Sequence, residues 1–359
     1  MPPGPGSGAG RSEFRGLFEV LRNEVSCAYA ARVTRPRALI FGVSGQDGPW
    51  VARDLGNAGY EVFGTHLTQL PPDGVVTRSV ALDLMDEQVD VRGLIERVAP
   101  RIIVFLAGRS SVAESWKDPA GTMTVNAASY ARILDAVRDI DPTIRVVHAS
   151  SSEMYGDTEG IIDESTSLRP NSPYAESKAV AHRLGVEARE RNGMNISNAI
   201  LTNHESVRRP LPYVFRRISV GAAALALGLI DELVLGDLDV IRDWGHAPDY
   251  AQAMALMALA PEPDDFVIAT GVSVSLRDVV ASALACVGLD DRWDLIALNP
   301  ALARSGSSYP VWANPDRIGR TLGWKAHDAA TSVISIMVTH DTEVLSDQGR
   351  RSDVLLRLG

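Results

Sequence analysis

A regular alternation of short apolar segments and longer amphipathic segments most constrains the fold of this 359-residue chain. Short apolar runs indicate strands, and segments with apolar residues at helical spacing indicate helices. Alternation of the two predicts an α/β fold with a Rossmann-type, doubly wound parallel sheet. We expect strands at 37–43, 60–67, 101–107, 145–151, 195–203 and 266–271, and helices at 48–59, 89–100, 121–140, 174–193 and 275–288.

The alternation loosens after residue 204, which predicts a smaller C-terminal substrate-binding lobe beside the sheet. The alanine-rich run 220–230 in that region is too short to span a bilayer and is expected to form a buried helix. We expect an N-terminal extension at 1–36, which is partly disordered and contains a short amphipathic helix at 13–30. An NAD(P)-binding Rossmann domain should follow at 37–205, with return segments near 238–272. The lobe should comprise 206–237 and 273–340, and a C-terminal tail should follow at 341–359.

Charge and composition argue against several classes of protein. A net charge of −10 and a pI near 5.2 do not suit a nucleic-acid partner, which requires a basic surface. Two cysteines, Cys27 and Cys286, without a CxxC motif predict neither a disulfide scaffold nor a metal site. The first 36 residues lack the pattern of a signal peptide, and no apolar run reaches the roughly 18 residues of a membrane span. We therefore expect a cytoplasmic protein without a membrane partner.

A glycine-rich turn follows the first expected strand and precedes the first expected helix. Gly42, Gly45 and Gly48 form a GxxGxxG pattern there. Glycine suits a tight turn whose backbone approaches a pyrophosphate, and the helix N-terminus offers N–H groups to the anion. Among 30 glycines such spacing also occurs by chance, so the strand–turn–helix context is what favours dinucleotide binding.

Two further positions bear on a dinucleotide. Asp83 follows a short strand and is either a contact to the adenine amino group or a solvated loop residue. The second expected strand ends at Thr65, His66 and Leu67, where an Asp would favour NAD and an Arg would favour NADP. Neither residue type is present, so the choice between NAD and NADP stays open.

A tyrosine and a lysine four residues apart suggest a redox site. Tyr174 and Lys178 share one face of an expected helix. A tyrosine has an ordinary pKa of about 10, which a nearby ammonium lowers, so that the phenol can act as a base. Such a pair alone is more often a surface feature. Ser151, at the end of a neighbouring strand, can contact the same substrate oxygen and favours a catalytic role for the pair.

With these motifs in place, the chain resembles the extended short-chain dehydrogenase/reductase superfamily, and within it the GDP-mannose 4,6-dehydratase family. The resemblance runs from about residue 37 to 340, and the NHES–RR and RDWG motifs are its most specific parts. It rests on GVSGQDG (42–48), ASSSEMYG (149–156), SPYAESK (172–178), NHESVRR (203–209), LVLGDLDVIRDWGHAPDY (233–250), DDFVIATGVSVS (264–275) and LGWK (322–325).

The resemblance implies roles for individual residues. Catalysis is assigned to Ser151, Glu153, Tyr174 and Lys178, with Glu153 as the acid–base residue. The implied cofactor contacts are Gly42, Gly45, Gln46, Asp47, Gly48, Asp83, Leu84, Leu106, Ala107, Tyr174, Lys178, His204 and Arg209. The implied substrate contacts are Asn203, Arg217, Arg242 and Arg304. The cofactor is NADP or NAD, tightly bound and recycled, and the partner is a nucleotide-diphosphate sugar, with a GDP-hexose favoured.

Glu153 separates the implied reactions. Oxidation at C4 of the sugar needs Tyr174 and Lys178, whereas loss of water across C5 and C6 also needs a carboxylate, which Glu153 provides. If Glu153 is only a solvated acid, the alternative is a nucleotide-sugar 4-epimerase or 4-ketoreductase of the same fold. A non-catalytic NAD(P)-binding regulator is the alternative of another class, and the complete catalytic set argues against it.

The chain departs from the family pattern in three places, one of which is the N-terminal extension at 1–36, which has no counterpart in that pattern. The segment 64–74 lacks the paired arginines and the serines that hold NADP and contact a neighbouring subunit. The implied homodimer or homotetramer and the preference for NADP are both weakened by this change. Near Arg304, Ser307 and Tyr309 stand at two positions where the family pattern has acidic residues. This change predicts different contacts to the nucleotide or its ribose.

Overall fold

A parallel seven-stranded sheet forms the centre of the molecule. The computed structural model describes residues 35–302 and 310–347, so the expected helix at 13–30 and Arg304 lie outside the described residues. In spatial order the strands are β11 (Phe266–Ile268), β7 (Ile196–Leu201), β5 (Arg145–Ser151), β4 (Ile102–Phe105), β1 (Arg37–Phe41), β2 (Glu61–His66) and β3 (Arg78–Ala81). All six pairings between neighbours are parallel, which confirms the doubly wound sheet predicted from the sequence.

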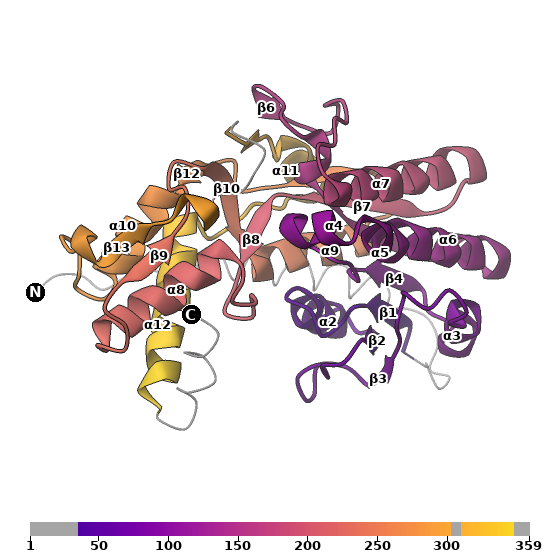
Figure 1. Ribbon diagram of the computed structural model, residues 1–359. Coiled ribbons are helices and arrows are strands. Elements are labelled where there is room, and N and C mark those ends of the chain that lie inside the picture. Colours follow the sequence, from indigo (N-terminus) through magenta and orange to yellow (C-terminus); the bar gives the residue numbers. More distant parts are fainter. Residues whose placement is uncertain (1–34, 303–309, 348–359) are drawn as a thin grey trace, which may run out of the picture.

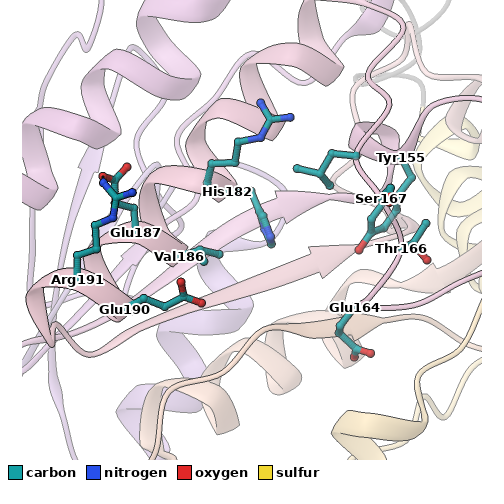
Figure 2. A pocket seen from close by; sticks show the side chains of 11 residues that line it. Tyr155, Glu164, Thr166, Ser167, His182, Val186, Glu187, Glu190 and Arg191 are labelled. Carbon is teal, nitrogen blue, oxygen red and sulfur yellow. The ribbon is translucent and has the colours of Figure 1, made fainter.

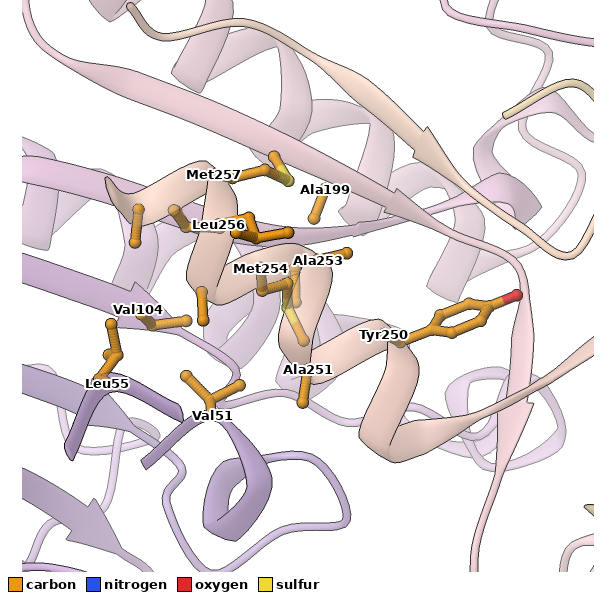
Figure 3. Close-up of a cluster of buried hydrophobic side chains, with 14 of the residues drawn as sticks. Val51, Leu55, Val104, Ala199, Tyr250, Ala251, Ala253, Met254, Leu256 and Met257 are labelled. Carbon is orange, nitrogen blue, oxygen red and sulfur yellow. The ribbon is translucent and has the colours of Figure 1, made fainter. Parts of the chain in front are cut away.

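Helices cover both faces of this sheet (Figure 1). On one face lie α3 (Val91–Val98), α6 (Ser129–Ile140) and α7 (Pro173–Asn192), and on the other lie α2 (Gly48–Asn57), α9 (Ala247–Leu259) and α11 (Asp316–Leu322). Figure 3 shows Met254 and Met257 of α9 in one buried cluster with Val51 of α2 and with Val104 and Ala199 of the sheet. Each fully buried Val, Leu or Met side chain in such a layer contributes about 1.5–3 kcal/mol to folding.

A smaller lobe stands beside the sheet, on the left in Figure 1. Its core lies among α8 (Val214–Ala226), α10 (Leu276–Ala285) and α12 (Ala330–Ser346), with β9 (Leu233–Leu235) paired to β13 (Ile296–Leu298). Residues 220–226 of the expected buried helix at 220–230 form the second half of α8, and the helix ends before the other four. A sheet of β8 (Asn203–Glu205), β10 (Ile241–His246) and β12 (Ser273–Ser275) joins lobe and main sheet. A short pair, β6 (Ile161–Ile162) and β14 (Trp312–Ala313), lies nearby.

Three expected elements differ from the structure. The helix expected at 121–140 is divided into α5 (Pro119–Met123), a π-helical turn at Thr124–Ala128, and α6. The strand expected at 195–203 breaks at Thr202, whose N–H donates to Ile268 O, before β8 joins another sheet. Helix α12 continues across residue 340, where a C-terminal tail was expected to begin, because its buried Asp341 pairs with Arg216 of α8.

The amino terminus of α7 is held by residues that the sequence pattern predicts. Ser172 accepts a hydrogen bond from Ala175 N–H at 3.1 Å, and Pro173 occupies the first helical position. Gly193 ends the helix in the left-handed conformation, at φ +64°, as its position after the helical run predicts. Within the described ranges, no helix is both long enough and apolar enough to cross a membrane.

A buried ion pair fastens α7 to the edge strand of the sheet. Asp265 accepts two hydrogen bonds from Arg189, at 2.7 and 2.8 Å, and further ones from the backbone and side chain of Asn198. Burial alone would raise the pKa of Asp265, but Arg189, His182 and Asn198 outweigh burial and lower it. The pair therefore stabilises the fold above the ordinary carboxyl pKa of 3.8, and the contribution is lost as pH falls through the lower folded value.

Asp265→Asn is expected to lower the free energy of unfolding by about 3 kcal/mol at neutral pH, because it leaves Arg189 without its charged partner. Urea unfolding at a series of pH values measures the effect, and the deficit should shrink below pH 3.8. Asp316→Asn is the matched control, since its pair with Arg320 is exposed and weak. Equal losses in the two variants would contradict the assignment.

Candidate active site

The glycine-rich turn lies between β1 and α2 and can accept only glycine at two positions. Gly42 has φ +86°, and a Cβ there would lie 2.8 Å from Ala107 N. A Cβ at Gly48 would lie 2.3 Å from Val43 O. Gly45 N–H donates to Gly42 O at 3.1 Å and closes the turn. This arrangement brings the backbone and the N-terminus of α2 together as an anion cradle.

Gln46 and Asp47 of the turn contact β8. Gln46 Nε2 donates to His204 O at 2.9 Å, and Asp47 Oδ2 lies 3.2 Å from His204 Nε2. The other ring nitrogen of His204, Nδ1, lies 2.8 Å from Thr202 O. Both nitrogens thus face acceptors, which requires the doubly protonated ring. Burial lowers the pKa of His204, but the Asp47 carboxylate outweighs burial and raises it.

Arg209 completes a buried charge cluster beside the turn. Its Nε lies 2.9 Å from Glu205 Oε2, and its guanidinium lies 4.0 Å from the ring centroid of Tyr213. Burial raises the pKa of Asp47 in isolation, whereas His204, Arg209 and Gln46 together lower it. The two cations offset the Asp47 and Glu205 carboxylates, so the turn does not face an unbalanced negative charge.

Ser151 and Tyr174 meet at the carboxyl edge of the sheet. Ser151 ends β5, and its hydroxyl accepts a hydrogen bond from Glu153 N–H at 3.3 Å. Tyr174 lies in the first turn of α7, where burial raises its pKa to about 12 and a hydrogen bond with Ser151 lowers it. The hydroxyls of Ser151 and Tyr174 thus lie within hydrogen-bond distance of each other, so both could contact the same oxygen of a substrate.

Lys178 does not act on Tyr174 as expected. Its Nζ donates to Ala149 O at 2.7 Å, and the cation that lowers the pKa of Tyr174 is Arg209. Burial lowers the pKa of Lys178 itself to about 8, against the opposing charge of Asp47. The lowering of the Tyr174 pKa expected from the sequence is therefore absent in this structure, because burial outweighs the nearby positive charge.

Glu153 lies beside two of the residues expected to bind substrate. Glu153, Asn203 and Arg242 line one cavity of about 10 Å³, together with Ser152, Gly156, Asn171 and Val311. The cavity therefore joins the end of β5 to β8 and β10. Arg242 is buried and donates from Nη1 to Ile241 O at 2.7 Å. Arg217 is not part of this lining and donates instead to Val234 O, at 3.1 Å.

The remaining expected cofactor contacts lie at the ends of β3 and β4. Leu106 N–H donates to Phe41 O, and the backbone of Ala107 packs directly against Gly42. Asp83 is exposed and accepts from Met85 N–H at 2.9 Å, while Leu84 is buried. The structure thus brings the expected cofactor residues to one edge of the sheet. The described residues contain no His, Cys, Asp and Glu cluster that could hold a metal ion.

A roomier groove of about 460 Å³ lies on the outer side of α7 (Figure 2). His182 and Val186 of α7 lie across it from Tyr155 and the loop 164–168. None of the expected site residues lines this groove. We therefore place the candidate site at the smaller cavity beside Glu153, where the expected residues converge.

Sequence reasoning missed several residues that support the site. Ser115 of α4 (Val112–Lys117) accepts the Tyr174 N–H at 3.1 Å. Asn126, on the π-helical turn, bonds both backbone groups of Arg109 and the hydroxyl of Ser177. Ser110 and Tyr213 join their hydroxyls at 2.7 Å between the β4 end and the lobe. Their roles depend on tertiary contact, and no local motif marks them.

The tightness of the turn leads to a prediction about two glycines of one helix. Gly48→Ala is expected to cost about 1–3 kcal/mol of stability and to weaken dinucleotide retention, because Val43 O must move. Gly56→Ala, with nothing within 4 Å, is the control and should gain roughly 0.5–1 kcal/mol. Urea unfolding and the dinucleotide content of the purified variants measure both effects. Equal behaviour of the two variants would contradict the cradle.

The doubly wound sheet, the glycine turn and the Ser–Tyr–Lys arrangement define the nucleotide-sugar epimerase and dehydratase group of the extended short-chain dehydrogenases/reductases. The family model described as GDP-mannose 4,6 dehydratase matches residues 39–337. The chain belongs to the GDP-mannose 4,6-dehydratase family, a family of hydro-lyases.

Individual relatives agree with this membership. The GDP-mannose 4,6-dehydratase of Yersinia enterocolitica is 38% identical over 352 residues, covering 86% of this chain and 94% of that protein. GDP-mannose 4,6 dehydratase 2 of Arabidopsis thaliana is 33% identical over 348 residues, with 91% and 92% covered. A dTDP-glucose 4,6-dehydratase structure from Streptomyces venezuelae, with NAD and TYD bound, has a TM-score of 0.74 at 23% identity, covering 86% and 98%, and supports the fold.

Proposed function

We propose that the chain removes water from GDP-mannose, or a closely related GDP-hexose, to form the 4-keto-6-deoxy sugar. The single observation that carries the proposal is that Glu153 lies at the same sheet edge as the Ser151–Tyr174 pair and shares a cavity with Asn203 and Arg242. Family membership supports the substrate class, since the relatives named above bear the name GDP-mannose 4,6-dehydratase.

The residues present fit a nicotinamide dinucleotide. A Cβ at Gly42 or Gly48 would collide with the backbone of Ala107 or Val43, so glycine keeps the turn tight where it leads into the N-terminus of α2. The turn itself includes Gln46 and Asp47, and His204 and Arg209 lie beside it. The Nζ of Lys178 lies near Gly108. When bound, the dinucleotide supplies a hydride acceptor for C4 and a hydride donor for C6, so it is recycled and stays bound.

The chain's own residues then move protons. Tyr174 takes the proton from O4 of the sugar while Ser151 holds the same oxygen, leaving a ketone at C4. The ketone acidifies the C5–H bond. Glu153 takes the C5 proton and passes it to the C6 hydroxyl, which departs as water while a C5–C6 double bond forms. Glu153 then delivers a proton drawn from solvent to C5, and Tyr174 releases to solvent the proton that it took from O4. The 4-keto-6-deoxy product would be complete once the bound dinucleotide supplied a hydride to C6.

Arg242 and Asn203 are proposed to hold the substrate beside Glu153, and Arg217 to hold it farther along the lobe. Guanidinium groups suit a diphosphate because they form paired hydrogen bonds with it. A homodimer or homotetramer, implied by the resemblance, stays a prediction.

The test is incubation of the purified full-length chain with GDP-mannose and no added cofactor. We expect a product lighter by one water in mass spectrometry, without net consumption of the bound dinucleotide. CDP-, UDP- and dTDP-hexoses serve as comparison substrates. Turnover that requires stoichiometric reduced dinucleotide would contradict the dehydratase assignment and favour a reductase.

A further inference from the structure

We propose that the carboxyl end of β2 selects NAD over NADP, with His66 as the residue that contacts the adenosine ribose. The inference rests on the proposed function in one respect, namely that the glycine turn binds a nicotinamide dinucleotide. It goes further by naming the cofactor and the residue that distinguishes it.

The end of β2 is attached directly to the glycine turn. Thr65 O accepts from Gly42 N–H at 3.1 Å and from Val43 N–H at 2.9 Å, and Thr65 Oγ1 lies 3.2 Å from Gly42 N. A Cβ at Gly64 would lie 2.3 Å from Val43 Cγ1. Because the pyrophosphate of a dinucleotide lies at such a turn, its adenosine ribose lies over the end of the next strand. In Figure 1 β2 lies directly beside β1 and α2.

His66 is a buried side chain with an unused ring nitrogen at this end. It is 8% exposed, and its Nδ1 has no hydrogen-bond partner within residues 35–302 and 310–347. Alternation along the strand puts it on the same face as Val62 and Gly64, the face that α2 and Val43 cover. Buried polar atoms are normally paired. A ribose hydroxyl of the cofactor would provide the missing partner without requiring a charge.

The charges around this end do not suit a 2′-phosphate. Such a phosphate is usually held by arginine or lysine, and no residue of either type occurs between His66 and Arg78. In the pairing of β2 with β3, Arg78 lies opposite Phe63 and Ala81 lies opposite His66. Arg78 is therefore three residues, or about 10 Å, along the strand from the position opposite His66. The segment after β3 instead carries Asp83, Asp86 and Glu87.

The arginines that border the region are engaged elsewhere. Arg132 donates to the carbonyl oxygens of Leu84, Asp86 and Glu87. Arg53 pairs with Asp54 at 2.9 Å and stacks on Trp50. Arg208 reaches the turn from the β8 side, where its Nη2 lies 3.4 Å from Ser44 O, and we place it with the pyrophosphate. NADP would therefore bring two negative charges to an acidic edge, whereas NAD brings a hydroxyl to His66.

The first test identifies the dinucleotide released when the purified full-length protein is denatured. We expect NAD by mass spectrometry. Calorimetric titration of the stripped protein should show NAD⁺ binding at least tenfold more tightly than NADP⁺. His66→Ala should weaken NAD⁺ binding roughly tenfold. Release of NADP, equal affinities, or unchanged NAD⁺ binding in His66→Ala would each overturn the proposal.

A matched pair of variants tests the location. Leu67 and Leu70 are exposed leucines, at 61% and 67%, on the same loop. Leu67→Arg places a guanidinium next to the strand end and should raise NADP⁺ affinity about tenfold, whereas Leu70→Arg should not. Equal gains would overturn the role of the β2 end. Loss of water from GDP-mannose with NADP bound would defeat this inference alone, and NAD⁺ binding without any loss of water would defeat the proposed reaction alone.

Discussion

Replacing Tyr174 with phenylalanine is expected to lower kcat by roughly 10³-fold and to stop the reaction before C4 is oxidised, because no other group at Ser151 would take the O4 proton. Ser151 can hydrogen-bond the oxygen but is far too weak a base to remove its proton. The change removes one hydroxyl from a buried site, so the fold and the affinity for substrate should be retained. In a single turnover, reduced dinucleotide and keto-sugar should both form roughly 10³-fold more slowly than in the wild-type chain.

Tyr60→Phe is the control for this variant. Tyr60 immediately precedes β2, at the opposite end of the strand from the candidate site, and burial raises its pKa as it does that of Tyr174. Rapid mixing of enzyme and GDP-mannose, followed by the absorbance of the reduced nicotinamide, measures the first step. Hydride transfer at the normal rate in Tyr174→Phe would show that another residue is the base.

The pKa of Tyr174 also predicts the direction of pH dependence. Burial raises the pKa of Tyr174 to about 12 and lowers the pKa of Lys178 to about 8. The phenol is therefore mostly protonated at neutral pH, and the rate of C4 oxidation should rise as pH increases from 6 to 9. The same profile in Tyr174→Phe should be flat. A rate that falls over this range in the wild-type chain would contradict the role of Tyr174 as base.

Much of the fold follows from local signals in the chain. Strand and helix alternation predicted the parallel sheet, and Gly193 marked the end of α7. The interruptions were not predictable from local pattern. Asn126 lies in a run that the local pattern predicts as one helix, and its contacts with Arg109 and Ser177 form only in the folded chain. Thr202 lies between β7 and β8, and its hydroxyl contacts Asp243 and Tyr250, which are distant in the sequence.

The candidate site shows the same division. Motifs located Ser151, Tyr174 and the glycine turn, since each is defined by residues close in the sequence. Electrostatics depend on burial and on groups distant in the chain, so the position of Lys178 against Ala149 O and the charge of Arg209 near Tyr174 could not be foreseen. The unpaired nitrogen of His66 is likewise visible only once β2 is packed against Val43.

Glu153→Gln is expected to separate oxidation from elimination. The amide keeps the size of the side chain in the cavity with Asn203 and Arg242 but can no longer accept the C5 proton. Product formation should fall by roughly 10²–10⁴-fold, the usual contribution of a positioned acid–base group. Tyr174 and Ser151 are unchanged, so C4 oxidation should continue and reduced dinucleotide should accumulate on the enzyme.

Two measurements distinguish this outcome from a general loss of activity. The absorbance of the reduced nicotinamide should rise at the normal rate and persist in Glu153→Gln, whereas in Tyr174→Phe it should rise roughly 10³-fold more slowly. In D₂O the wild-type product should carry deuterium at C5, and the sugar recovered from Glu153→Gln should not. Glu176→Gln, an exposed glutamate two residues after Tyr174 on α7, controls for loss of charge. Normal water loss in Glu153→Gln would show that another residue carries the proton from C5 to the C6 hydroxyl, because Tyr174 and Ser151 alone can oxidise C4 but cannot make that transfer.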